Sequence, residues 1–137
     1  MEDLSLSEAE RVLAAGITKA TETSVPVNIA VLDAGTNLKA FVRMDGALLG
    51  SIDVAMGKAR TSALFQMNSE ALFEFCRPGG TSFGLENSNG GLIVFAGGRP
   101  LLVDGAVVGA VGVSGGSVDQ DDAIAQAAAA ALHAVTV

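Results

Sequence analysis

A glycine-rich segment at 111–117 leads from a predicted strand into a predicted helix. Backbone N–H groups at a helix N-terminus can bind a carboxylate or a phosphate, and glycines allow the ligand to approach. Three aspartates follow within 119–122 and disfavour a highly charged phosphate. The alternative is a tight connection whose glycines only permit close packing. We predict a carboxylate site formed by Ser114, Gly115 and Gly116.

Scarce basic residues are the other candidates for holding an acidic ligand. Arg43 ends a predicted strand, where a guanidinium can pair bidentately with a carboxylate, and Lys58 and Arg60 lie beside the apolar face of a predicted helix. The alternatives are an exposed pair of Arg43 with Asp45 and a solvated position for Lys58. We predict that Arg43 and Lys58 bind the ligand. If the ligand is turned over, Asp45 or Asp121 would carry the proton.

Metal and nucleophile sites are disfavoured by the residues present. His133 is the only histidine and ends a predicted helix, where a cation interacts favourably with the helix dipole. Cys76 has neither a second cysteine nor a histidine close in sequence. Segment 112–116 matches the G-x-S-x-G pattern of a hydrolase nucleophile, but the chain is too short for that fold. We expect no metal site.

Length and charge limit the classes of function. The 137 residues predict a single domain, 1–137. Eight basic against fifteen acidic residues exclude a general nucleic-acid binder, because that affinity depends on Lys and Arg neutralising phosphates. The acidic start shows no signal-peptide pattern, and no apolar run is long enough for a membrane span. With one cysteine, these features lead us to expect a cytoplasmic protein that does not bind membranes.

The elements that position these residues follow from periodicity and turn signals. An S-x-x-E capping box at 5–8 begins a helix that lasts to 21–24, and β-rich runs at 27–32 and 38–43 flank turn residues in a hairpin. The other elements are helices at 52–63 and 70–75, a long loop at 77–91, strands at 92–95, 100–103 and 106–113, and a helix opening on an S-x-x-Q box at 117–120.

This order, αββααβββα, predicts the fold class. Because the strands are joined mainly by turns, we expect an antiparallel five-stranded sheet flanked by helices, an α/β (α+β) domain. The small residues of segment 123–134 favour close packing against another subunit, and hence a homo-oligomer.

Several stretches together carry a family signature. They resemble the haem-degrading-domain family, the GlcG/HbpS/PduO C-terminal-domain-like proteins, over nearly the whole chain. The matching stretches are Val31-Leu32-Asp33-Ala34-Gly35, Arg43-Met44-Asp45-Gly46-Ala47, Lys58-Ala59, Gly97-Gly98 with Pro100-Leu101, Val108-Gly109-Ala110-Val111-Gly112-Val113-Ser114-Gly115-Gly116, and Gln120-Asp121. The resemblance implies an α/β domain with a five-stranded sheet, assembly into homo-oligomers, and haem binding, with haem breakdown in some members.

The sequence departs from the family pattern where iron ligands are concerned. Thr36-Asn37-Leu38 stands where relatives commonly carry Gly-His-Leu, and the first helix has no histidine. Haem iron is usually held by His, Cys, Met or Tyr, and Tyr is absent. The remaining donors, each with a simpler structural role, are His133, Cys76, Met44, Met56 and Met67.

Three functional hypotheses remain. The first is a small-molecule-binding protein whose ligand carries a carboxylate, haem or a similarly flat molecule, held by Arg43 and the 114–116 turn. The second is an isomerase or hydrolase acting on a small organic acid. The third is an accessory subunit in organic-acid or aromatic catabolism.

Overall fold

The computed structural model describes residues 3–133, apart from the side chain of His133, so the helix-dipole role expected for that side chain lies outside the described residues. The elements are α1 (Leu6–Glu22), β1 (Asn28–Asp33), β2 (Leu38–Arg43), α2 (Gly50–Phe65), α3 (Ser69–Cys76), a short 3-10 helix η1 (Leu85–Asn87), β3 (Gly98–Val103), β4 (Ala106–Ser114) and α4 (Val118–His133).

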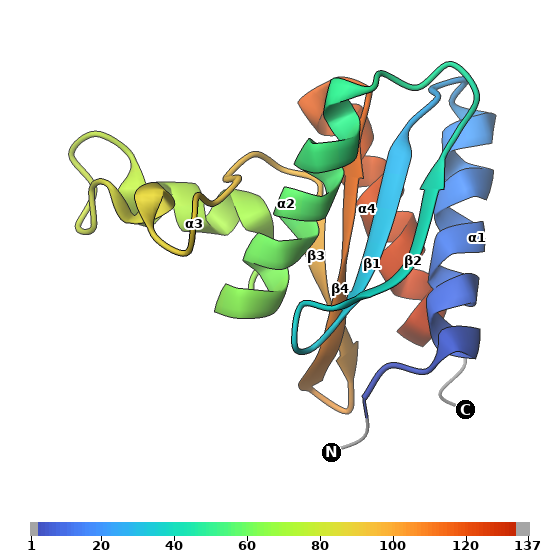
Figure 1. The fold of residues 1–137 in the computed structure, drawn as a ribbon, viewed down its shortest axis with the longest axis horizontal. Coiled ribbons are helices and arrows are strands. Elements are labelled where there is room, and N and C mark those ends of the chain that lie inside the picture. Colours follow the sequence, from blue (N-terminus) through green and yellow to red (C-terminus); the bar gives the residue numbers. More distant parts are fainter. Residues whose placement is uncertain (1–2, 134–137) are drawn as a thin grey trace.

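An antiparallel sheet with strand order β2-β1-β4-β3 forms the middle layer. Helices α1 and α4 cover one face, and α2 crosses the other (Figure 1). The larger apolar core lies between the sheet and α1 and α4, and it includes Val12, Ile29, Val111 and Ile124. The α+β class is therefore confirmed.

The prediction of five strands in the order αββααβββα was wrong. The described residues form four strands, because segment 92–95 is not a strand. The amide of Leu92 donates to the carbonyl of Glu86 at 2.7 Å, and Ile93 packs against Gly57 of α2. A short apolar run indicates that its side chains are buried, but not which element buries them. Here Ile93 packs on a helix and not on a neighbouring strand.

The two predicted capping boxes are confirmed. The Ser5 hydroxyl accepts from the Glu8 amide at 3.1 Å while the Glu8 carboxylate accepts from the Ser5 amide at 2.9 Å. Ser117 and Gln120 make the same two bonds before α4, at 3.2 and 2.9 Å. These reciprocal bonds satisfy donors that a helix start leaves free.

Helix α2 lies very close to the sheet. A Cβ added to Gly112 of β4 would be 2.6 Å from the Ala59 nitrogen and would also meet the Ala55 carbonyl oxygen. The contact surface on this side consists mainly of alanines, together with Leu32. The absence of large side chains therefore brings α2 down onto β4.

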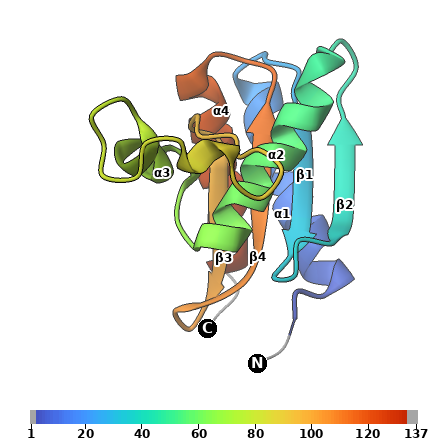
Figure 2. The ribbon, with the colours of Figure 1, turned by 60° about the vertical axis from the view of Figure 1, so that its left-hand side comes forward.

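Segment 77–91 and the preceding α3 extend away from the sheet, as the two views show (Figures 1 and 2). Phe83 in this segment is 70% exposed. Of the described helices, none is long and apolar enough to cross a membrane.

Candidate functional site

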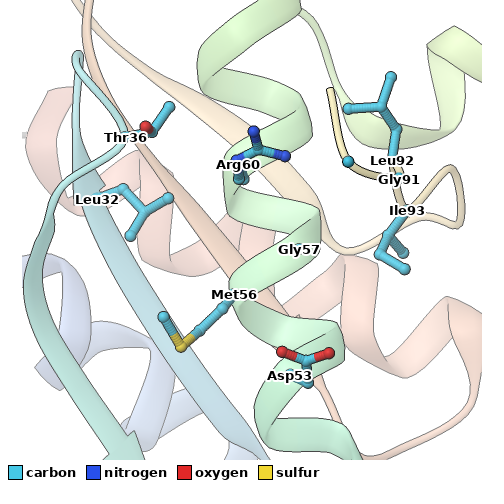
Figure 3. Close-up of a pocket in the computed structure, with 10 residues that line it drawn as sticks. Leu32, Thr36, Asp53, Met56, Gly57, Arg60, Gly91, Leu92 and Ile93 are labelled. Carbon is cyan, nitrogen blue, oxygen red and sulfur yellow. The ribbon is translucent and has the colours of Figure 1, made fainter. Parts of the chain in front are cut away.

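A groove of about 420 Å³ runs along the outer face of α2 (Figure 3). Small-molecule pockets typically occupy about 300 to 1,000 Å³, so its size suits a ligand. We call it the α2 groove. Its lining residues are Leu32, Thr36, Asp53, Met56, Gly57, Arg60, Gly90, Gly91, Leu92 and Ile93.

The floor of the α2 groove is one face of the helix. Asp53, Gly57 and Arg60 are spaced four and three residues apart, which places them on the same side of α2. A Cβ on Gly57 would be 2.6 Å from Cγ1 of Ile93, so only glycine admits this wall at its present distance. Arg60 donates from Nη1 to the carbonyl of Asn89 at 2.7 Å, which ties the wall to the helix.

The guanidinium of Arg60 can also serve a ligand. It has five N–H donors, and the bond to Asn89 uses one of them. Leu32 and Met56 lie toward one side of Arg60 and Ile93 lies on the other (Figure 3). This combination suits a molecule with an apolar body and a carboxylate, although the exposed Asp53 carboxylate restricts the negative charge to the Arg60 end.

Next to the groove, the α2-facing side of β2 is left open. Helix α2 packs on β4, β1 and β3. Figure 2 shows β2 at the edge of the sheet, on the far side of β1 from α2. Phe41 of β2 is half-buried and packs, with Met56, against the cluster that contains Leu32. An aromatic ring and a thioether thus extend the apolar wall of the α2 groove across the sheet.

The predicted residues Arg43 and Asp45 lie at the end of β2, and both are exposed. Arg43 pairs in register with Asn28, which in turn pairs with Ser114 of β4. The three residues therefore share one face of the sheet. Arg43 and Ser114 therefore lie in one row across the sheet, as a ligand bound by both of them requires. That they bind a ligand stays a prediction.

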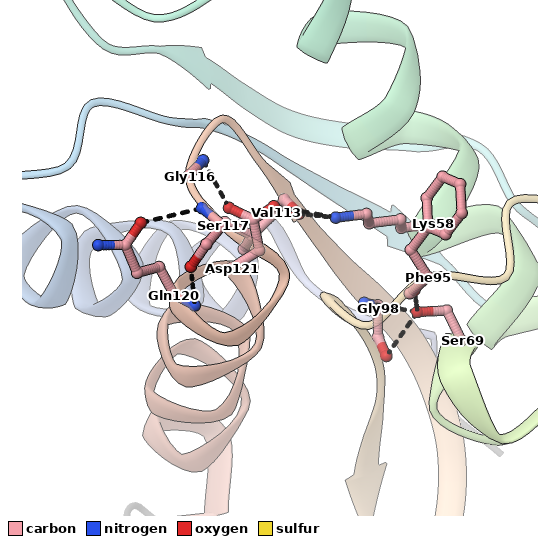
Figure 4. Close-up of polar contacts among 9 residues, drawn as sticks. All are labelled: Lys58, Ser69, Phe95, Gly98, Val113, Gly116, Ser117, Gln120 and Asp121. Carbon is pink, nitrogen blue, oxygen red and sulfur yellow. Dashed lines mark hydrogen bonds and ion pairs between the residues drawn. The ribbon is translucent and has the colours of Figure 1, made fainter.

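Lys58 and Asp121 form a buried ion pair (Figure 4). The Lys58 side chain is 2% exposed, and its Nζ lies 3.1 Å from Oδ2 of Asp121 and donates to the carbonyl of Val113 at 2.9 Å. The sequence placed Lys58 at the edge of an apolar face. In the structure it joins α2, β4 and α4, and its ammonium is directed to groups of the chain itself.

The glycine turn before α4 already holds a carboxylate. Oδ1 of Asp121 accepts from the Gly116 amide at 2.8 Å (Figure 4). A Cβ on Gly115 would lie 2.8 Å from the carbonyl oxygen of Pro26, so this glycine also permits close packing. Burial raises the pKa of Asp121, against the lowering effects of the Gly116 amide and Lys58. The Gly116 amide, which we predicted would bind the carboxylate of a ligand, thus binds a carboxylate of the chain itself.

Other donor groups do not assemble in the part of the chain that is described. No group of three or more His, Cys, Asp or Glu side chains there could hold a metal ion. Cys76 is buried, and burial, together with the nearby Glu86, raises the pKa of its thiol. A thiol with a raised pKa has less of the reactive thiolate.

Sequence reasoning missed the α2 groove although its signals were present. Arg60 is separated from Asp53 and Gly57 by helical spacing, and Gly90-Gly91 precede the opposite wall. Nothing in that spacing shows that segment 90–93 would fold back against α2. The groove combines segments 32–36, 53–60 and 90–93, which are far apart along the chain, so only the tertiary structure reveals it.

Comparison with known proteins identifies related chains. A family model described as "Haem degrading protein HbpS-like" matches residues 4–130. A 15.0 kDa protein of the dhaT-dhaS intergenic region of Citrobacter freundii is 36% identical over 91% of this chain and 89% of its own. Protein GlcG of Escherichia coli K12 is 39% identical over 81% of each chain. The corrinoid adenosyltransferase PduO of Salmonella typhimurium is 36% identical, but this chain covers 40% of it.

Solved structures share the fold. The Klebsiella pneumoniae protein ORFY superimposes with a TM-score of 0.94 at 35% identity, covering 98% of this chain and 94% of ORFY. A PduOC:heme complex superimposes with a TM-score of 0.89 at 36% identity, covering 95% of each chain.

Proposed function

The chain belongs to the HbpS-like family of haem-degrading proteins, and on that premise we propose that it binds haem or a similarly flat, carboxylate-bearing molecule in the α2 groove. Support from a relative is direct, because a structure of the 36% identical PduOC is a complex with haem.

The observation that carries the proposal is the composition of the α2 groove. Apolar walls from Leu32, Met56 and Ile93 flank a single guanidinium, that of Arg60, and half-buried Phe41 continues the apolar surface. A flat molecule gains from contact with such walls, and a carboxylate on its edge can pair with Arg60.

The residues of the groove fit haem at two points. The thioether of Met56 is a ligand type that haem iron accepts, and Arg60 can pair with a propionate. Met56 and Arg60 would hold the haem, which would supply a redox-active iron. The chain's own part is to orient the ring between Phe41, Met56 and Ile93 and to neutralise one acid group.

We extend the proposal to the location and the oligomeric state of the protein. We place the protein in the cytoplasm as a homo-oligomer, as its sequence suggested. The enzyme hypothesis is only an alternative, because Asp45 is exposed at the sheet end and Asp121 is held by Lys58. The accessory subunit is the other alternative.

Titration with hemin, followed by the Soret band at micromolar protein, tests the proposal. We expect saturable binding, about tenfold weaker binding for Arg60→Ala because a charge-assisted bond is lost, and a displaced Soret maximum with a small affinity change for Met56→Leu. Arg43→Ala distinguishes the α2 groove from the end of β2, the site expected from the sequence, and should bind as the unmodified chain does if the ligand lies in the α2 groove. Absence of a saturable change overturns haem binding. If Arg43→Ala weakens hemin binding and Arg60→Ala does not, hemin binds at the end of β2 and not in the α2 groove.

A further inference from the structure

The α2 groove carries opposite charges at its two ends. Of its lining residues, only Asp53 and Arg60 are charged. Seven residues of α2 separate them, which is about two turns, so their backbones lie about 10 Å apart along the helix axis. Figure 3 shows the two side chains at separate levels of α2, with Gly57 between them. The groove therefore has an acidic end and a basic end.

Both charged side chains are available to a ligand. Asp53 is exposed and Arg60 is half-buried. None of the ion pairs between described residues includes either of them, so neither charge is neutralised within the described part of the chain. The bond from Nη1 of Arg60 to the Asn89 carbonyl holds the guanidinium at the wall and leaves most of its donors for a ligand.

The groove is apolar between the two charges. Leu32 and Met56 lie toward one side of α2 and Ile93 lies on the other (Figure 3). A hydrocarbon or aromatic body gains free energy from contact with these side chains. A body that spans them brings its two ends close to different charges. The groove therefore distinguishes the two ends of its ligand.

We propose that the α2 groove prefers a dipolar ligand, with a carboxylate at Arg60 and an ammonium group at Asp53. This inference rests on the proposed function, from which it takes the carboxylate at Arg60. Asp53 determines the selectivity at the far end of the ligand, because its charge attracts a cation and repels a second carboxylate. Haem presents an uncharged edge to Asp53 when both of its acid groups are directed to Arg60, so Asp53 neither attracts nor repels that edge.

Asp53 also has a structural role, which the test must separate from selectivity. It lies in the first turn of α2, where a negative charge interacts favourably with the helix dipole. That interaction stabilises the helix and does not distinguish one ligand from another. Asp119 is exposed in the first turn of α4, outside the groove, so Asp119→Asn is a matched control.

The test compares three probes of equal chain length, 8-aminooctanoate, octanoate and octanedioate, whose far ends are cationic, neutral and anionic. Titration at low salt, followed by the amide NMR signals of Met56, Gly57 and Ile93, measures each affinity. We expect 8-aminooctanoate to bind about tenfold more tightly than octanedioate, with octanoate between them. Asp53→Asn should reduce this ratio to about threefold or less, Asp53→Lys should reverse it, and Asp119→Asn should leave it unchanged.

Equal affinities of 8-aminooctanoate and octanedioate for the unmodified chain overturn the proposal, even if the Asp53 variants do not fold. A preference that survives Asp53→Asn overturns it as well, and so does the absence of binding by all three probes. If hemin binding depends on Arg60 and the probes are not distinguished, the proposed function stands and this inference fails. If the probes follow the expected order and hemin does not bind, haem binding fails and the selectivity stands.

Discussion

Asp121 shows how one side chain can connect three elements. Its two oxygens bond to the Gly116 amide and to Lys58, which itself reaches the Val113 carbonyl. Taking charges out of water can cost more than a buried ion pair returns. That balance is why burial raises the pKa of Asp121 in spite of Lys58.

We predict that the Asp121 carboxyl titrates above 3.8, its ordinary value, when followed by carbon NMR. A raised pKa means that the native state binds the proton more tightly than the unfolded state, so its contribution to stability is complete below 3.8 and is lost as pH rises through the native pKa. Each unit of increase corresponds to about 1.4 kcal/mol. Lys58→Met should move the midpoint further upward, because the favourable attraction is removed.

Asp121→Asn keeps an oxygen for the Gly116 amide and provides the control in urea unfolding. Between pH 4 and 7 the unmodified chain should lose stability relative to this variant. The opposite slope, or a carboxyl midpoint below 3.8, would contradict the prediction.

At the scale of elements, the packing of α2 on the sheet depends on glycine. We predict that Gly112→Ala costs at least about 3 kcal/mol of unfolding free energy, since the new Cβ would meet the backbone at Ala55 and Ala59 rather than a flexible side chain. Gly50→Ala is the matched control, because nothing lies within 4 Å of its Cβ position and alanine favours a helix. Urea denaturation measures both. Equal stabilities of the two variants would show that α2 can move away from β4.

At the scale of the whole molecule, the segment that follows α3 extends away from the sheet (Figure 1). Phe83 is 70% exposed and lies outside the two clusters of buried apolar residues. If the chain forms the homo-oligomer expected from its sequence, we expect this phenyl ring to be buried at the interface between subunits. Phe83→Ser should change the unfolding free energy of the protomer by no more than about 0.5 kcal/mol and should reduce the sedimentation coefficient.

Thr81→Ala in the same segment is the control and should sediment as the unmodified chain does. A monomeric unmodified chain would contradict the expected assembly, and an unchanged oligomer in Phe83→Ser would place the interface elsewhere.

Local chemistry was sufficient to predict most of the elements. The caps at Ser5 and Ser117 and the turn at Asp104-Gly105 depend on residues within a few positions of one another, and all three formed. Both residues of that turn have positive φ, as the two-residue hairpin requires. The segment at 92–95 was assigned wrongly because apolar character indicates burial without naming the surface that buries it.

The sequence by itself determined the α+β class, the family and the approximate positions of the helices, since these depend on periodicity, caps and a linear signature. Tertiary structure decided the sites. It placed Arg60 and Met56 opposite Ile93, and it directed Lys58 to the carboxylate of Asp121 at the glycine turn. The physical reason is that a site joins groups distant along the chain, and the free energy that brings them together comes from packing α2 on the sheet.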